Sequence, residues 1–132
     1  MKIKSKEGNI NRSAKEVFDY LSDMNNFQHL LPQDKISNWE ADKNSCSFKI
    51  QGATSISFVI DSVEEPNIIH MVSGDNAPFD FKLDVHLNED NGVTIGYQEF
   101  EADINMFMKM MVEKPLKNLF DFIVDRLQEQ LN

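Results

Sequence analysis

Several features that mark other protein classes are scarce or missing in this sequence. It contains one cysteine, Cys46, and therefore cannot form an internal disulfide. No apolar run approaches the roughly 20 residues that a membrane-spanning helix needs, so we expect no membrane insertion. The first six residues alternate lysine with other side chains and form no apolar run. We therefore expect no signal peptide and take the cytoplasm as the default compartment.

Positive charge is also in short supply. The chain holds 13 lysine and arginine residues against 22 aspartate and glutamate residues, which gives a formal net charge of −9. A nucleic-acid-binding protein needs a basic surface that displaces counterions from phosphates, so we expect no nucleic-acid partner. Anionic membrane surfaces are disfavoured for the same reason.

The sequence also lacks the usual motifs for metal ions, phosphates and nucleophilic catalysis. His29, His70 and His86 belong to three separate predicted elements, and no two have the spacing of metal ligands, so we predict no metal and no cofactor. There is no Gly-rich phosphate loop and no Gly-x-Ser-x-Gly motif. Cys46 and His70 would form a thiol–imidazole pair only if both faced inward, and single buried cysteines are mostly small hydrophobes. We therefore assign no catalytic residue.

What is present suffices for a globular core. Hydrophobic residues make up 41% of the chain and aromatic residues 10%. A length of 132 residues suits one domain. Because no repeat or low-complexity linker interrupts the chain, residues 1–132 are predicted to form a single domain.

The N-terminal quarter predicts a strand and two short helices. Residues 2–10 are predicted to be a strand with its three lysines on one face. Ser13 and Glu16 form a capping box, in which the serine hydroxyl accepts the amide of Glu16 and the glutamate reaches back. Apolar residues at helical spacing follow as far as Leu21. A second short apolar turn then ends at Pro32.

The middle of the chain is typical of an antiparallel sheet. From residue 36 to residue 104 the hydrophobic period is two, and no helical pattern separates the strands. Asn91 and Gly92 form a hairpin signal because both tolerate positive φ. In the run 93–104 the apolar residues change parity. We predict a bulge at residues 98–99 that returns them to one face.

The C-terminal segment, residues 105–131, is predicted to be one long helix. An apolar stripe runs from Leu116 to Leu131, and methionines extend it towards the N-terminus. Pro115 lies inside the helix and is predicted to kink it near Met111. At ~1.5 Å per residue the helix is about 40 Å long, enough to cross a whole sheet.

These elements together predict a curved sheet around a helix. A sheet of about seven strands spaced ~4.8 Å apart is roughly 29 Å wide, whereas one helix is only about 10–12 Å across. The sheet must therefore curl around the long helix, and the two short helices must close one end. The predicted fold class is α+β: a curved seven-stranded antiparallel sheet wrapped around the C-terminal helix, with two short helices between strands one and two.

This plan resembles the START-related superfamily, whose helix-grip fold is also called SRPBCC. The residues that carry the resemblance are 13–23, Phe27, Leu31, Pro32, 46–52 and 114–116. The superfamily includes lipid carriers, hormone receptors, polyketide cyclases and aromatases, co-chaperone domains and ubiquinone-binding proteins. The resemblance implies a hydrophobic pocket between sheet and helix and leaves the activity open.

The predicted ligand site is the space between the sheet and the long helix. Inward apolar residues of the strands and the Met-rich half of the helix would form its walls, since thioether side chains adapt to different apolar ligands. The same methionines could instead be core filler. The predicted ligand-binding residues are Phe48, Ile50, Phe58, Ile60, Phe81, Leu83, Val85, Tyr97, Glu99, Met106, Phe107, Met110 and Met111.

Three functions are compatible with this plan. The leading hypothesis is binding or transport of a small hydrophobic or amphipathic molecule, without catalysis. The second is a cyclase- or dehydratase-like enzyme in the same pocket, with Tyr97 and Glu99 as its polar pair. The third is a protein-interaction module whose core is closed by its own side chains. Pocket volume separates the third hypothesis from the other two, and pocket polarity separates the first from the second. The sequence does not predict an oligomeric state.

Overall fold

The computed structural model describes residues 1–51, 55–75 and 77–132. Gly52, the last residue of segment 46–52, lies outside this range. The elements in chain order are β1 (Lys2–Lys4), β2 (Gly8–Ile10), α1 (Ala14–Leu21), the 3-10 helix η1 (Met24–Leu30), β3 (Ile36–Ala41), β4 (Ser45–Ile50), β5 (Ser55–Glu64), β6 (Ile68–Ser73), β7 (Phe81–Asp90), β8 (Val93–Ala102) and α2 (Met106–Leu131).

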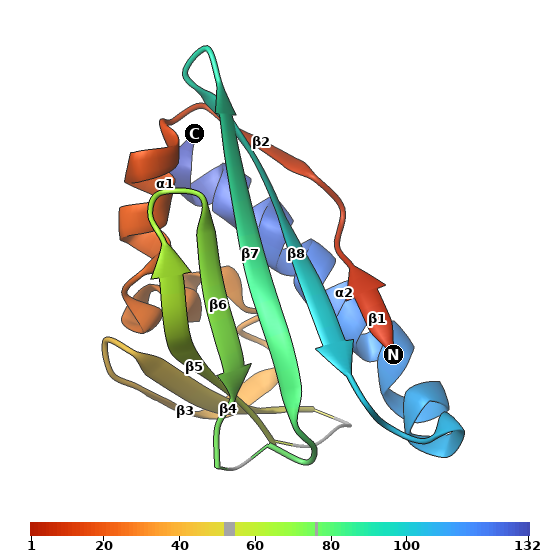
Figure 1. Ribbon diagram of the computed structural model, residues 1–132. Coiled ribbons are helices and arrows are strands. Elements are labelled where there is room, and N and C mark those ends of the chain that lie inside the picture. The colour runs from red at the N-terminus through yellow and green to blue at the C-terminus, as the bar shows by residue number, and fades with distance from the viewer. Residues whose placement is uncertain (52–54, 76) are drawn as a thin grey trace.

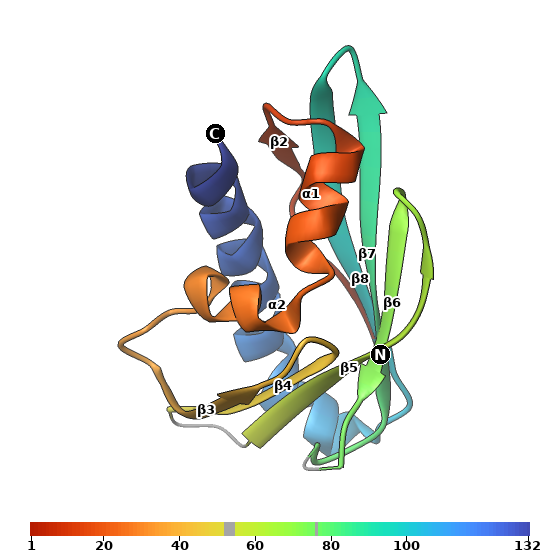
Figure 2. The ribbon, with the colours of Figure 1, turned by 90° about the vertical axis from the view of Figure 1, so that its left-hand side faces the viewer.

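The strands form one antiparallel sheet in the order β1-β8-β7-β6-β5-β4-β3, and β2 also pairs with β8. Helix α2 runs diagonally behind β7 and β8 (Figure 1). The sheet curls, so that β3 and β4 lie across one end of the interior while β7 and β8 stand along its side (Figure 2). Helix α1 and η1 lie between α2 and the sheet. The helix-grip architecture predicted from the sequence is thereby confirmed.

The predicted first strand is interrupted, which gives the sheet eight strands instead of seven. Lys4 pairs with Glu99, and Gly8 pairs with Gly96. Four steps along the N-terminal segment therefore match three steps along β8, which is the one-residue excess of a β-bulge. The pairing of β8 with β7 is continuous. The bulge predicted at residues 98–99 is therefore wrong, because the extra residue lies in the segment that pairs with β8.

Strand β8 carries apolar residues on both of its faces, and this explains the change of parity. Its buried, inward side chains are those of Thr94, Gln98, Phe100 and Ala102, together with Gly96. Its outward residues are Val93, Ile95, Tyr97, Glu99 and Glu101. The hairpin before it is formed as predicted, with φ of 54° at Asn91 and 81° at Gly92.

The predicted start of the first helix is confirmed. The hydroxyl Oγ of Ser13 accepts a hydrogen bond from the backbone N–H of Glu16 at 3.2 Å. This bond satisfies one of the four amides that the first turn of a helix leaves without a partner. The buried face of α1 is formed by Ala14, Val17, Phe18 and Leu21.

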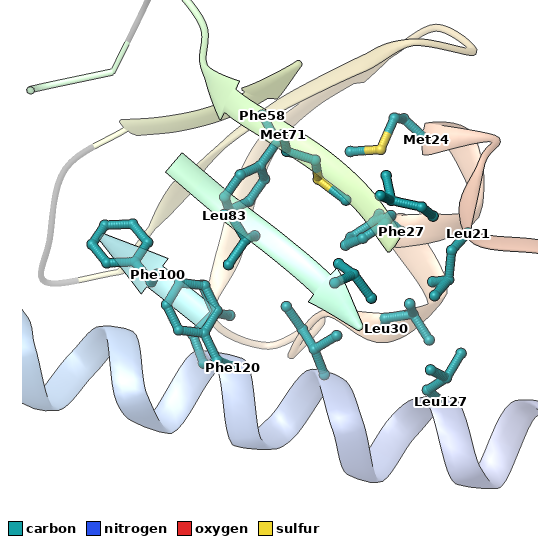
Figure 3. Close-up of a cluster of buried hydrophobic side chains, with 14 of the residues drawn as sticks. Leu21, Met24, Phe27, Leu30, Phe58, Met71, Leu83, Phe100, Phe120 and Leu127 are labelled. Carbon is teal, nitrogen blue, oxygen red and sulfur yellow. The ribbon is translucent and has the colours of Figure 1, made fainter. Parts of the chain in front are cut away.

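A continuous core lies between the sheet and the helices (Figure 3). Leu21, Phe27 and Leu30 from α1 and η1 point towards the strands, and Phe120 and Leu127 of α2 cover the other side (Figure 3). Fully burying one such side chain contributes about 1.5–3 kcal/mol relative to leaving it exposed. The buried residues of α2 are Leu116, Leu119, Phe120, Ile123, Val124 and Leu127.

Helix α2 is longer than the sheet that it crosses. Its 26 residues span about 39 Å at 1.5 Å per residue, whereas a strand of 10 residues such as β8 spans about 33 Å. Its first turns extend beyond the end of β8 (Figure 1). Among residues 1–51, 55–75 and 77–132, no helix combines the length and apolarity needed to cross a bilayer.

Candidate functional site

The strand residues predicted to face the interior do so. Phe48, Phe58, Phe81, Leu83 and Val85 are all buried on the inner face of the sheet. Ile50 and Ile60 are half-buried and pack against the same core. The regular period-two pattern therefore placed all seven side chains on the correct side of the sheet.

Aromatic rings occupy the space in which a pocket was predicted. The ring centroids of Phe58 and Phe81 are 5.5 Å apart, those of Phe81 and Phe100 5.1 Å, and those of Phe100 and Phe120 5.3 Å. These separations lie within the 4.5–7 Å range of favourable ring contacts. The four rings join β5, β7, β8 and α2 into one packed row. A ligand that enters the interior must therefore displace some of these rings.

Hollows of about 340 to 430 Å³ on the described residues open to solvent along strand edges and on the outer face of the sheet. One of about 410 Å³ lies between β1 and α2, and its lining residues are Lys2, Ile3, Lys4, Glu113, Lys114 and Lys117. Lysines and a glutamate line most of it, but the aliphatic parts of these side chains make its accessible wall more apolar than polar.

The methionines of α2 are not where the sequence pattern placed them. Met106, Phe107, Met110 and Met111 are 68%, 71%, 77% and 58% exposed. We call these four residues the apolar tip. At about 100° per residue, Met111 and Phe107 lie about 140° and 180° around the helix from Leu116, whereas the half-buried Val112 lies on the same side as Leu116 and packs against the core. The apolar tip therefore faces away from the core, and the first turns of α2 also extend beyond the end of β8 (Figure 1).

The polar pair Tyr97 and Glu99 also lies elsewhere. Both residues point outward from β8. The ring of Tyr97 stacks on His86 with centroids 4.7 Å apart and planes at 14°, and Lys4 Nζ lies 4.4 Å from its centroid. Glu99 Oε1 is 2.7 Å from His86 Nε2, and this nitrogen makes no hydrogen bond with the described residues. The prediction that this pair lines the interior is wrong.

Cys46 and His70 occupy opposite faces of the sheet. Cys46 is buried, and the loss of solvent raises the pKa of its thiol to about 12. His70 faces outward, with Nε2 2.7 Å from Glu64 and Nδ1 2.7 Å from Asp84. The hydrogen bonds to Glu64 and then to Asp84 raise the pKa of His70. Because the sheet separates the thiol from the imidazole, the two side chains form no dyad.

One inward polar residue was missed. Gln98 is only 3% exposed, and its Nε2 donates to the backbone oxygen of Phe120 at 3.2 Å. Its Oε1 is buried and has no hydrogen-bond partner among the described residues. The predicted bulge hid this residue, because it reversed the facing of the strand between positions 97 and 100. Without the bulge, the parity of Phe100 already places Gln98 inside.

Comparisons with known proteins agree with this fold. A family model described as a carbon monoxide dehydrogenase subunit (CoxG) matches residues 7–132. No curated protein sequence matches the chain significantly. The protein XoxI of Bacillus cereus superposes with a TM-score of 0.75 at 11% identity, over 98% of this chain and 94% of that one.

Two further solved structures are similar. An uncharacterized protein of Bacillus thuringiensis has a TM-score of 0.74 at 11% identity, over 99% of this chain and 98% of that one. A START superfamily protein of Mycobacterium smegmatis has a TM-score of 0.69 at 9% identity, over 98% and 96% of the two chains. At such identities the likeness shows the fold alone, which is START-related.

Proposed function

The chain belongs to the CoxG family, which is described as a carbon monoxide dehydrogenase subunit. From its helix-grip fold and its apolar tip, we propose that this protein binds or carries a small hydrophobic or amphipathic molecule. The ligand would lie between the Phe-lined inner face of the sheet and α2 and would extend to the apolar tip at the start of the helix. The START-related fold supports this proposal, and a wall of hydrophobic and aromatic side chains is typical of apolar ligand sites.

The observation that carries the proposal is the exposure of the apolar tip. Four large apolar side chains are 58% to 77% exposed on two successive turns of one helix. Scattered exposed apolar residues are common, but contiguous ones mark places where something binds. Covering them stabilises the protein by about 25 cal/mol per Å² of apolar surface. Methionines, which have flexible side chains, can adapt to ligands of different shapes.

The polarity of the interior indicates the class of ligand. All four buried polar side chains among the described residues, those of Ser5, Ser57, Thr94 and Gln98, are uncharged, and Thr94 and Gln98 belong to the inner face of β8. A charged ligand group in the interior would have no partner of opposite charge, which is costly at low dielectric. The proposal is therefore a neutral ligand, or one whose charged group remains at the open end.

Two measurements test the proposal. Small molecules extracted from the native purified protein should be detectable by mass spectrometry. The wild type should also bind the apolar fluorescent probe N-phenyl-1-naphthylamine. The double variant Met106→Lys/Met110→Lys should weaken this binding at least about tenfold, because it places two charges where apolar contact is made. Val63→Lys is the matched control, since Val63 is 46% exposed on β5 and lies outside the apolar tip.

The wild type and both variants should have free energies of unfolding within about 0.5 kcal/mol of one another, because the changed side chains are exposed. Equal weakening by Val63→Lys would attribute the effect to net charge and contradict the assignment of the tip. A stable wild type that binds no probe and yields no extracted molecule would contradict the proposed function itself.

The packed row of rings favours a second candidate. A core closed by Phe58, Phe81, Phe100 and Phe120 suits a protein-interaction module, whose partner would then cover the apolar tip. The interaction-module hypothesis becomes the favoured one if the wild type binds no probe. The cyclase-like alternative loses its only polar pair, because Tyr97 and Glu99 lie on the outer face.

A further inference from the structure

We propose that Gln98 is the polar anchor of the interior ligand site, and that the ligand carries a neutral hydrogen-bond donor of the hydroxyl type at its innermost end. This inference rests on the proposed function and narrows the class of ligand. Within the described residues, Gln98 is the one side chain on the inner face of β8 with a buried acceptor that has no hydrogen-bond partner.

Gln98 lies on the inner face of β8, between the inward residues Gly96 and Phe100. It projects from β8 towards α2 and is held by Nε2, which donates to Phe120 at 3.2 Å. Its backbone N–H donates to Ser5 Oγ at 2.9 Å, and its backbone oxygen accepts from the N–H of Ser5 at the same distance. The inward neighbour along the strand is Phe100, which is buried. Backbone and amide nitrogen are thus anchored, whereas Oε1 finds no partner in the described part of the chain.

A buried acceptor without a donor is uncommon in folded proteins, because its hydration is lost and nothing replaces it. The bond to Phe120 fixes the amide orientation, since the reverse assignment would place Oε1 against the Phe120 oxygen. The other inward polar residue of β8 shows the normal situation: Thr94 Oγ1 donates to the backbone oxygen of Arg12 at 2.7 Å. A hydrogen-bond donor on the ligand would satisfy Gln98 Oε1 in the same way.

Of the other buried side-chain atoms without a partner among the described residues, those of Ser57 and His86 have outward positions on β5 and β7, and Tyr20 Oη is carried by α1. Because the interior buries no carboxylate among the described residues, an ammonium donor would be left without a counter-charge. A carboxylate offers no proton to Oε1. A hydroxyl satisfies the amide oxygen and introduces no charge.

The direction of the ligand follows from the strand. Beyond Gln98, the inward residues Phe100 and Ala102 lead along β8 to Ile104 and then to the apolar tip. Six residues of extended chain span roughly 20 Å. The proposed ligand is therefore an elongated molecule with its hydroxyl at Gln98 and its apolar body directed towards the tip, and its entry displaces the rings of Phe100 and Phe120.

The experiment compares two isomers that differ in a single respect. 1-Undecanol and decyl methyl ether have the same composition, but only the alcohol donates a hydrogen bond. Each is titrated against wild type loaded with N-phenyl-1-naphthylamine. The alcohol should displace the probe at about tenfold lower concentration than the ether, the factor expected from one hydrogen bond of average net strength. In Gln98→Met the two isomers should become equivalent.

Thr94→Val is the matched control, because it removes a buried hydroxyl from the same face whose hydrogen bond is already made. It should keep the tenfold preference. Gln98→Leu provides a second test if the methionine variant folds poorly, and the ratio in the wild type needs no variant at all. A wild type that binds the probe without preferring the alcohol overturns this inference and leaves the proposed function standing. A preference that persists in Gln98→Met also overturns it. Failure of every ligand to bind overturns the proposed function and this inference with it.

Discussion

Truncation of Leu119 should lower the free energy of unfolding strongly, whereas truncation of Met110 should barely change it, although both residues lie on α2. Leu119 is 5% exposed and Met110 is 77% exposed. A buried leucine replaced by alanine loses its transfer free energy and leaves a cavity, which together cost about 2–5 kcal/mol. An exposed methionine loses almost nothing, and alanine has the higher helix propensity. The free energy of unfolding of Met110→Ala should therefore stay within about 0.5 kcal/mol of the wild type.

The difference is large enough for simple assays. For a domain of this size, 1 kcal/mol shifts the midpoint of thermal unfolding by about 4 °C. Leu119→Ala should therefore melt roughly 8–20 °C below the wild type, and Met110→Ala within about 2 °C of it. Urea unfolding followed by circular dichroism gives the same comparison at constant temperature, and unchanged slopes would show that both variants unfold from equally compact states.

A loss of more than about 2 kcal/mol in Met110→Ala would refute this reasoning, because a side chain in contact with solvent cannot leave a cavity. It would mean that the first turns of α2 are packed against something in solution. The sensitive case is the ligand-loaded protein. If the ligand covers the apolar tip, Met110→Ala should reduce the extra stability that saturating ligand gives, while the ligand-free stability is unchanged.

Three further outcomes follow from individual contacts. Ser13→Ala should lower the free energy of unfolding by about 1 kcal/mol through loss of the capping bond to Glu16, and an unchanged melting temperature would argue against that cap. Glu64 and Asp84 raise the pKa of His70 above its ordinary value of 6.5. The contribution of His70 to the free energy of unfolding is therefore fully present below the ordinary pKa and is lost as the pH rises through the raised pKa. The wild type should accordingly exceed His70→Gln in stability by more at about pH 6 than at about pH 9. A gap that widens with pH would contradict the pairing. Cys46 has its pKa raised to about 12 by burial, so iodoacetamide should label it in urea and leave the native protein unmodified, whereas rapid native labelling would place it at the surface.

The fold was predictable because its local signals agree with one another. The capping box at Ser13, the hairpin at Asn91 and Gly92, and the alternation in β7 each specify an element without reference to the rest of the chain. The switch from a period of two to a helical period marks the boundary before α2. The break between Lys4 and Gly8 was missed, and the bulge was placed in β8 instead. It depends on how two segments far apart in sequence pair, and neither segment shows it alone.

The facing of the apolar tip was predictable from the helical period, and the prediction that it extends the stripe was wrong. At about 100° per residue, Met111 and Phe107 lie about 140° and 180° around α2 from Leu116. The same period places Val112 beside Leu116, and Val112 packs against the core. The methionines were assigned to the stripe because they are apolar, although their spacing puts them on another face of the helix.

The facing of β8 was also predictable, because two observations on the sequence determine it jointly. A two-residue turn at positions 91 and 92 pairs Asp90 with Val93, and the register then continues step by step. It places Gln98 opposite Val85, whose inward position follows from the cleanest alternation in the chain. Tyr97 and Glu99 must then point outward, however apolar their neighbours are. Cross-strand pairing is the more reliable guide here, because directly opposite residues of an antiparallel pair point to the same face of the sheet. The positions of apolar residues are less informative, because a single strand can carry apolar residues on both of its faces.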